Sequence, residues 1–113
     1  FLPRLIGLPK AAALMMTGES VSAEKAEQMG MIYAVYADAE FESKSLELAK
    51  SISEMPTKGL GYTKKLLNHS LNNTLEEQLD LEAETQALSA KSEDHKEGIQ
   101  AFLEKRKPVF TGK

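Results

Sequence analysis

The chain has 113 residues, of which 42% are hydrophobic and 27% are charged, and its formal net charge is −3. This length allows one small domain with a modest core, and the composition is that of a folded protein rather than a disordered segment. The negative charge argues against nucleic-acid binding, which needs a clear basic excess. There is neither an apolar run long enough to cross a bilayer nor a visible signal peptide, so we expect no membrane association.

The cysteine count is zero, which excludes disulfides, thiolate nucleophiles and cysteine-ligated metals and is consistent with a cytoplasmic location. The charge is unevenly placed along the chain. Residues 104–113 carry four cations and one anion, a charge of +3, so the other 103 residues carry −6. A short basic tail on an acidic body is a candidate contact for a small phosphorylated ligand.

The first third of the chain predicts short helices. One covers 4–6, and the run 10–16 predicts another, because its Ala, Leu and Met residues favour helix. A third helix is expected over 23–29, with Ser22 as its N-cap and Gly30 at its end.

Residues 31–36 form the only strand-like run, short and rich in β-branched and aromatic residues. A single strand cannot satisfy its backbone hydrogen bonds, so we expect its partners to lie outside this chain or in another copy of it. The sequence also starts abruptly with the apolar residue Phe1. Both features predict that the chain is a piece of a larger protein.

A long helix is predicted over 39–54, and Pro56 breaks it. Thr57 is a candidate cap for the helix that follows. Apolar side chains recur at helical spacing on one face of the first of these helices: Phe41, Leu48, Ile52 and Met55.

Two further helices are marked by their caps. Thr74 and Glu77 form a T-x-x-E capping box, which starts a helix that runs to about residue 90. Ser92 is expected to cap the last helix, which must end before Pro108. The whole chain is therefore predicted to be mainly α.

A search for catalytic groups finds no complete active site. His69 and His95 lie among polar neighbours without a zinc-ligand spacing, so we expect surface histidines and no metal. The many carboxylates of 76–84 fit a solvated helix face better than a general acid or base, which needs burial or a close partner. Phosphate-binding glycine loops and serine-nucleophile motifs are also missing.

The last helix combines an apolar patch, Ile99, Phe102 and Leu103, with the basic residues of 105–107 at its end. Cations favour a helix C-terminus through its dipole, and the aromatic ring can simply belong to the core. The functional alternative is a ring that packs on a nucleobase beside an ammonium that pairs with a phosphate. The residues alone leave both interpretations open.

Three stretches of the chain carry sequence motifs whose order and spacing are characteristic of a protein family. They are 3–32, with the motifs T-G, S-A-x-x-A and G-M-I; 55–65, where Met-Pro-Thr precedes a helix that bears Lys64 and Lys65; and 94–106, which reads D-x-x-E-G-x-x-A-F-x-E-K-R. Together they cover essentially the whole chain. They resemble the C-terminal part of the crotonase (enoyl-CoA hydratase/isomerase) superfamily.

The resemblance implies a fold. The chain is expected to be the C-terminal helical, trimer-forming region of a crotonase-like ββα spiral, with one short strand near 31–36. Residues 1–37 would close the crotonase core, and 38–113 would form the C-terminal helical domain. The full-length protein is expected to form a homo-oligomer, a trimer or a dimer of trimers.

The resemblance also implies an enzyme acting on acyl-CoA, with an oxyanion hole of two backbone N–H groups. These donors and the catalytic acids would precede Phe1, so we expect no catalytic residue here and an inactive fragment. Coenzyme A belongs to the substrate, and no separate cofactor is expected. Phe102 and Lys105 match the family positions that contact the adenine and phosphate end of coenzyme A, often across a subunit boundary.

The segments 30–32, 74–82 and 108–113 are most similar to a branch that isomerises ring-1,2-epoxides of CoA esters in phenylacetate degradation. Two alternatives remain open at this point. The protein could be an enoyl-CoA hydratase of the same superfamily, or the chain could be a non-catalytic helical oligomerisation module.

Overall fold

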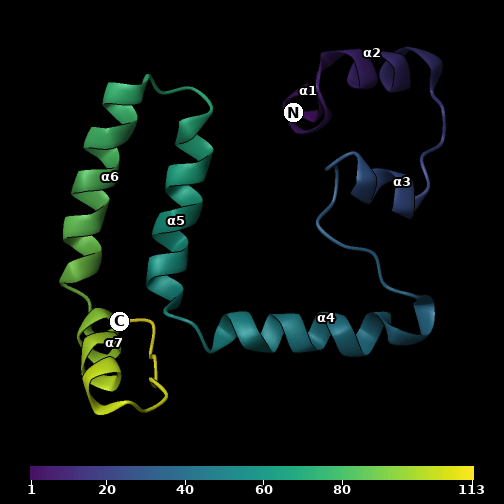
Figure 1. The fold of residues 1–113 in the computed structure, drawn as a ribbon. Helices are drawn as coiled ribbons and strands as arrows, with labels where there is room; N and C mark the ends of the chain where they lie inside the picture. Colours follow the sequence, from purple (N-terminus) through teal and green to yellow (C-terminus); the bar gives the residue numbers. More distant parts are fainter. The chain divides into compact units, whose positions relative to one another are not determined.

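The computed structural model describes residues 1–113 as seven α-helices joined by turns and short loops (Figure 1). This confirms the predicted mainly α class. The helices are α1 (Leu2–Ile6), α2 (Leu8–Thr17), α3 (Ala23–Gln28), α4 (Asp38–Ser53), α5 (Thr57–Ser70), α6 (Leu75–Ala90) and α7 (Glu93–Glu104).

Contacts divide the chain into two compact units, Phe1–Lys44 and Ser45–Lys113, with the boundary inside α4. The sequence-based division falls slightly earlier, after residue 37. Its assignment of the two parts to a crotonase core and a helical domain stays a prediction. None of the helices has the length and apolarity needed to cross a membrane.

The first unit is built from short helices whose ends are set by local signals. Gly18 closes α2 in the left-handed conformation, with φ of 66°, and its N–H donates to the Leu14 carbonyl. The Ser22 side chain accepts from the Lys25 N–H at 3.3 Å, which confirms the predicted cap of α3. The buried apolar residues of this unit are small or medium-sized: Ile6, Ala11 and Ala26.

The short strand predicted near 31–36 does not form. Residues 31–33 form bends and 34–36 have no regular secondary structure, and together they link α3 to α4. A strand is stabilised by hydrogen bonds to a neighbouring strand, and the chain holds no second strand. The strand-like composition of 31–36 therefore produces no sheet within these 113 residues.

In the second unit, α5 and α6 pack side by side as an antiparallel hairpin, and α7 follows directly from α6 (Figure 1). The capping box at α6 is confirmed: Thr74 Oγ1 accepts from the Glu77 N–H at 3.3 Å, and Glu77 Oε2 accepts from the Thr74 N–H at 2.8 Å. The expected cap at Thr57 is wrong. Pro56 occupies the N-cap position and makes no side-chain cap bond, because Thr57 is already the first residue of the helix.

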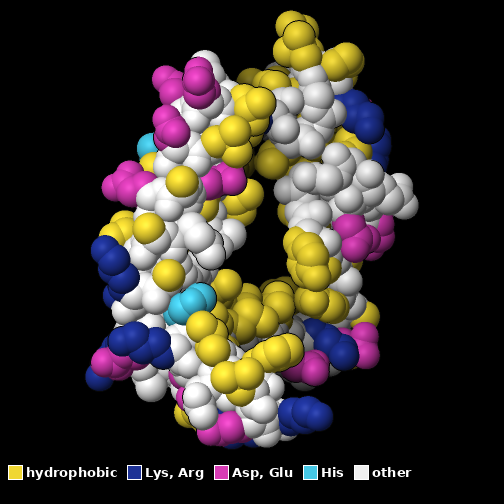
Figure 2. Space-filling model, turned by 60° about the vertical axis from the view of Figure 1, so that its left-hand side comes forward, with side chains coloured by type: hydrophobic (Ala, Val, Ile, Leu, Met, Phe, Trp, Pro, Cys, Tyr) yellow, Lys and Arg dark blue, Asp and Glu magenta, His cyan; other side chains and the backbone are white.

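The helices leave much of their apolar surface uncovered. The only buried hydrophobic residue of the second unit is Ala101. Large apolar side chains remain exposed along its helices (Figure 2), among them Leu67 (64%), Leu75 (77%), Leu79 (56%) and Phe102 (82%). The amphipathic faces predicted from the sequence are thus present, but within this chain they bury little area.

Candidate functional site

The last helix, α7, has well-defined ends. The Ser92 side chain accepts from the His95 N–H at 3.1 Å, as the sequence predicts. At the other end, Lys105 adopts the left-handed conformation with φ of 54° and ψ of 39°. Its N–H donates to the Phe102 carbonyl at 3.2 Å, while the Arg106 N–H donates to the Ala101 carbonyl at 3.0 Å. These two bonds form a Schellman motif, which reverses the chain after α7.

The two residues predicted to contact the ligand both lie at this helix end. Phe102 lies in the last turn of α7 with 82% of its surface exposed. Lys105 is the residue that terminates the helix, and it is the only residue other than glycine with a positive φ. The structure therefore brings an exposed aromatic ring and an exposed cation together within one turn. Contact with coenzyme A remains a prediction.

A cleft of about 370 Å³ lies beside Phe102. Its walls come from the start of α5, the end of α6, α7 and the C-terminal tail, and its lining is mainly apolar, including Ile99, Leu103 and Phe110. Gly98 faces the Phe110 ring of the tail, and a Cβ there would lie 3.7 Å from that ring, an ordinary van der Waals contact. The cleft can accept an apolar group next to the exposed ring.

The histidines differ from each other. His69 is exposed on α5, as expected for a surface histidine. His95 is half-buried and lines the cleft, which the polar neighbours in its sequence did not indicate. No group of three or more His, Asp or Glu side chains is arranged to hold a metal ion.

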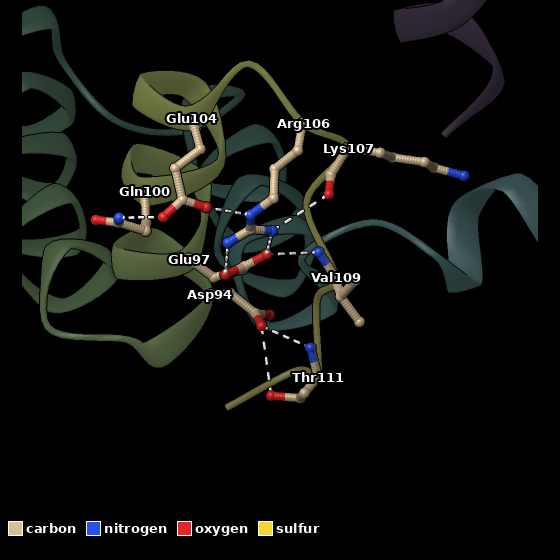
Figure 3. Close-up of polar contacts among 8 residues, drawn as sticks. All are labelled: Asp94, Glu97, Gln100, Glu104, Arg106, Lys107, Val109 and Thr111. Carbon is tan, nitrogen blue, oxygen red and sulfur yellow. Dashed lines mark hydrogen bonds and ion pairs between the residues drawn. The ribbon is translucent and has the colours of Figure 1, made fainter.

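An ion-pair network joins α7 to the segment after it (Figure 3). Arg106 Nη1 and Nη2 donate to the two carboxylate oxygens of Glu97 at 2.6 and 2.9 Å, and Arg106 Nε donates to Glu104 Oε2 at 2.5 Å. Glu97 Oε1 also accepts from the Val109 N–H at 2.8 Å. The Arg106 hydrogen bonds, followed by that of Val109, lower the pKa of Glu97 from the ordinary 4.5 to about 2.

The pKa values of Glu104 and Arg106 also shift in the directions that favour their charged forms. The pKa of Glu104 is lowered, first by the hydrogen bond from Gln100 and then by the one from Arg106. The pKa of Arg106 is raised, mainly by its hydrogen bonds to Glu97. Glu97, Glu104 and Arg106 are therefore charged across the physiological pH range.

A second set of polar contacts, made by Asp94 and Glu93, holds the end of the tail. Asp94 is only 3% exposed, and its carboxylate accepts from the backbone N–H groups of Thr111 at 2.7 Å and Gly112 at 2.9 Å. The Lys113 carbonyl in turn accepts from the N–H of Glu93 at 2.8 Å, which satisfies a free donor of the first turn of α7. The sequence showed Asp94 only as one letter of a family motif. No local signal indicated this role, because its partners lie 17 and 18 residues further along the chain.

Comparison with known proteins identifies a family that matches the whole chain. The sequence profile of the family described as Enoyl-CoA hydratase/isomerase matches residues 1–113. The chain belongs to the enoyl-CoA hydratase/isomerase family. The resemblance found in the sequence is thereby confirmed.

Individual relatives of this family member carry both isomerase and hydratase names. The chain is 44% identical over 112 residues to the 1,2-epoxyphenylacetyl-CoA isomerase of Escherichia coli K12, covering 99% of the chain and 43% of that protein. It is 38% identical over 113 residues to a protein of Rhodobacter capsulatus named probable enoyl-CoA hydratase, covering 100% of the chain and 44% of that protein.

Solved structures of the enoyl-CoA hydratase/isomerase family share the fold of this chain. An enoyl-CoA hydratase from Geobacillus kaustophilus superposes with a TM-score of 0.94 at 33% identity, covering 99% of this chain and 42% of that one. The chain thus spans less than half the length of the relatives it matches. The expected fold, the helical C-terminal region of crotonase-like proteins, agrees with this likeness.

Proposed function

We propose that this chain is the C-terminal part of an acyl-CoA isomerase that acts on ring-1,2-epoxyphenylacetyl-CoA. The 44% identity to a relative named 1,2-epoxyphenylacetyl-CoA isomerase supports this substrate. The similarity of 30–32, 74–82 and 108–113 to that branch of the family points the same way. Coenzyme A enters as part of the substrate, so the proposal requires no separate cofactor.

Within that enzyme, the chain would supply part of the coenzyme A pocket through Phe102 and Lys105. The observation that carries this assignment is the pairing of an 82% exposed ring with a cation at the same helix end. An exposed aromatic face can stack on an adenine, at about 1–3 kcal/mol per base. An ammonium can pair with a phosphate oxygen through a charge-assisted hydrogen bond.

The test uses the full-length protein with Phe102→Ala and Lys105→Ala. Each variant should raise KM for the acyl-CoA ester while kcat changes little, because the nucleotide end lies away from the reacting atoms. Lys96→Ala, which removes an exposed lysine from the same helix, is the matched control. Unchanged KM in both Phe102→Ala and Lys105→Ala would show that the site assignment is wrong.

A hydratase is the second candidate, supported by the 38% identity to a protein named probable enoyl-CoA hydratase. Product analysis separates the two reactions. An isomerase converts the epoxide ester into an isomer of equal mass, whereas a hydratase adds the mass of one water to an enoyl-CoA. Efficient hydration without isomerisation would replace the first proposal by the second.

The chain should also provide an oligomerisation surface, and we expect a trimer or a dimer of trimers for the full-length protein. The exposed leucines of α5 and α6 supply the apolar area that such an interface needs. Sedimentation of the full-length protein tests this expectation, and a single monomeric species at high concentration would contradict it. If the 113 residues alone self-associate but the full-length protein turns over no CoA ester, the non-catalytic oligomerisation module becomes the better description.

A further inference from the structure

Lys105 occupies a backbone conformation that it does not favour. The left-handed region costs an L-residue roughly 1–2 kcal/mol relative to the right-handed helix, and glycine is the usual residue at this position of a Schellman motif. Lys105 is nevertheless held there, with φ of 54°. Surrounding contacts must therefore stabilise this turn, and they identify the residues that decide where Lys105 lies.

Those contacts come from its neighbour Arg106. Its guanidinium donates to the Glu104 carboxylate, just before Lys105, and to the Lys107 carbonyl, just after Arg106. It also donates to both carboxylate oxygens of Glu97, two turns earlier in α7 (Figure 3). The planar fork of arginine is suited to such a two-point contact, and a lysine cannot reproduce it. The segments on both sides of Lys105 are thus tied to the body of α7.

The three consecutive cations at this helix end also differ in what they contact. Arg106 is paired with Glu97 and Glu104, and Lys107 Nζ lies 3.2 Å from Glu54 Oε2. Lys105, by contrast, forms no ion pair with an acidic side chain. Two of the three cations are therefore engaged within the protein, and the one in the constrained turn is left for an external anion.

We infer that Glu97 and Arg106 are positioning residues, which hold Lys105 in one fixed place beside Phe102 for the nucleotide end of the substrate. This inference rests on the proposed function, because it assigns a supporting pair to the same site. The Glu97 carboxylate also accepts the Val109 N–H, so the same group fixes the chain on the far side of the turn. Neither residue needs to touch the ligand.

The experiment compares two substrates in the full-length protein: the acyl-CoA ester and the matching acyl-pantetheine thioester, which lacks the nucleotide. Arg106→Lys keeps the charge but loses the two-point contact. It should raise KM for the CoA ester about tenfold, the order expected when one charge-assisted hydrogen bond to the ligand is lost. The pantetheine thioester should show no change, and kcat should hold for both substrates.

The double variant Lys105→Ala/Arg106→Lys separates this inference from the proposed function. If Arg106 acts through Lys105, the double variant should be no worse than Lys105→Ala alone. Fully additive effects, or an unchanged KM in Arg106→Lys while Lys105→Ala is impaired, would overturn the inference and leave the site assignment intact. No effect of Lys105→Ala would instead remove the proposed site itself.

Glu97→Gln provides a second route to the same test, should Arg106→Lys be poorly folded. Glutamine retains one oxygen for the Val109 N–H but cannot pair with both guanidinium nitrogens as an anion. We expect the same selective rise in KM for the CoA ester. Equal losses on the CoA ester and the pantetheine thioester would mean a general structural role and would count against positioning.

Discussion

Glu97 and Arg106 are nine residues apart in the sequence, and their side chains meet through two N–O contacts of 2.6 and 2.9 Å at the C-terminal end of α7. This pair closes the chain reversal that begins at Lys105 and carries the tail back along α7. The hydrogen bonds from the Thr111 and Gly112 N–H groups to Asp94 attach the end of the tail to the start of α7. Helix end, cleft wall and basic tail therefore form one connected unit.

The Glu97 pair should make the tail sensitive to acid. The pKa of Glu97 is lowered to about 2 from 4.5, so its stabilisation is fully present above about pH 4.5 and is lost as the pH falls towards 2. Amide hydrogen exchange of 105–113 should be faster in Glu97→Gln than in the parent protein at pH 6, and this difference should shrink at pH 3. A difference independent of pH would contradict the assignment.

Replacing Lys105 by glycine should separate stability from ligand binding. Lys105→Gly relieves the left-handed strain and should stabilise the end of α7 by about 1 kcal/mol, whereas Lys105→Ala retains the strain. Both variants lose the ammonium, so both should raise KM for the acyl-CoA ester to the same extent. Chemical denaturation and steady-state kinetics of the two proteins provide the check; an equal stability of both variants would count against strain at this position.

The capping box of α6 can be tested by a matched pair of substitutions. Thr74→Ala removes the acceptor for the Glu77 N–H and should destabilise the start of α6 by about 1 kcal/mol. Thr74→Ser keeps the hydroxyl oxygen and should have little effect. Hydrogen exchange at 75–79 reports the local change, and equal protection in the two variants would mean that the cap contributes nothing.

Gly112 should tolerate no side chain. It has φ of 78°, and a Cβ there would lie 2.6 Å from Thr57 Oγ1, so Gly112→Ala should release the end of the tail from Asp94. The double variant Thr57→Ala/Gly112→Ala removes the clash but not the backbone strain, and we expect partial recovery. Exchange of the 111–113 amides measures both effects. Full recovery would assign the whole effect to the clash, and no recovery would assign it to the strained backbone.

Local signals explain why most helices could be predicted. Ser22, Thr74 with Glu77, and Ser92 each act on a backbone N–H three residues away, so the sequence contains both partners of the interaction. Thr57 failed as a cap because the helix starts one residue earlier than assumed, a boundary shift that local patterns do not resolve. The strand at 31–36 failed because a strand depends on a distant partner.

Only part of the candidate site could be predicted from the sequence. Phe102 and Lys105 could be named because an aromatic and a cation three residues apart share a helix end and match a family motif. Three adjacent basic residues do not indicate which of them form ion pairs. The structure shows that Arg106 and Lys107 are paired and that Lys105 forms no ion pair with an acidic side chain. The half-buried position of His95 in the cleft depends equally on packing between α5, α6 and α7.

The sequence by itself determined the helical class, the caps of α3, α6 and α7 and the family of this protein, because these depend on neighbouring residues and on motif order along the chain. Only the tertiary structure decided how the last helix is connected to its tail. Asp94 reaches residues 17 and 18 positions ahead, and Glu97 reaches Val109, 12 positions ahead. Such contacts require a chain reversal at Lys105, a residue whose own conformational preference opposes that turn, so no local pattern could have predicted them.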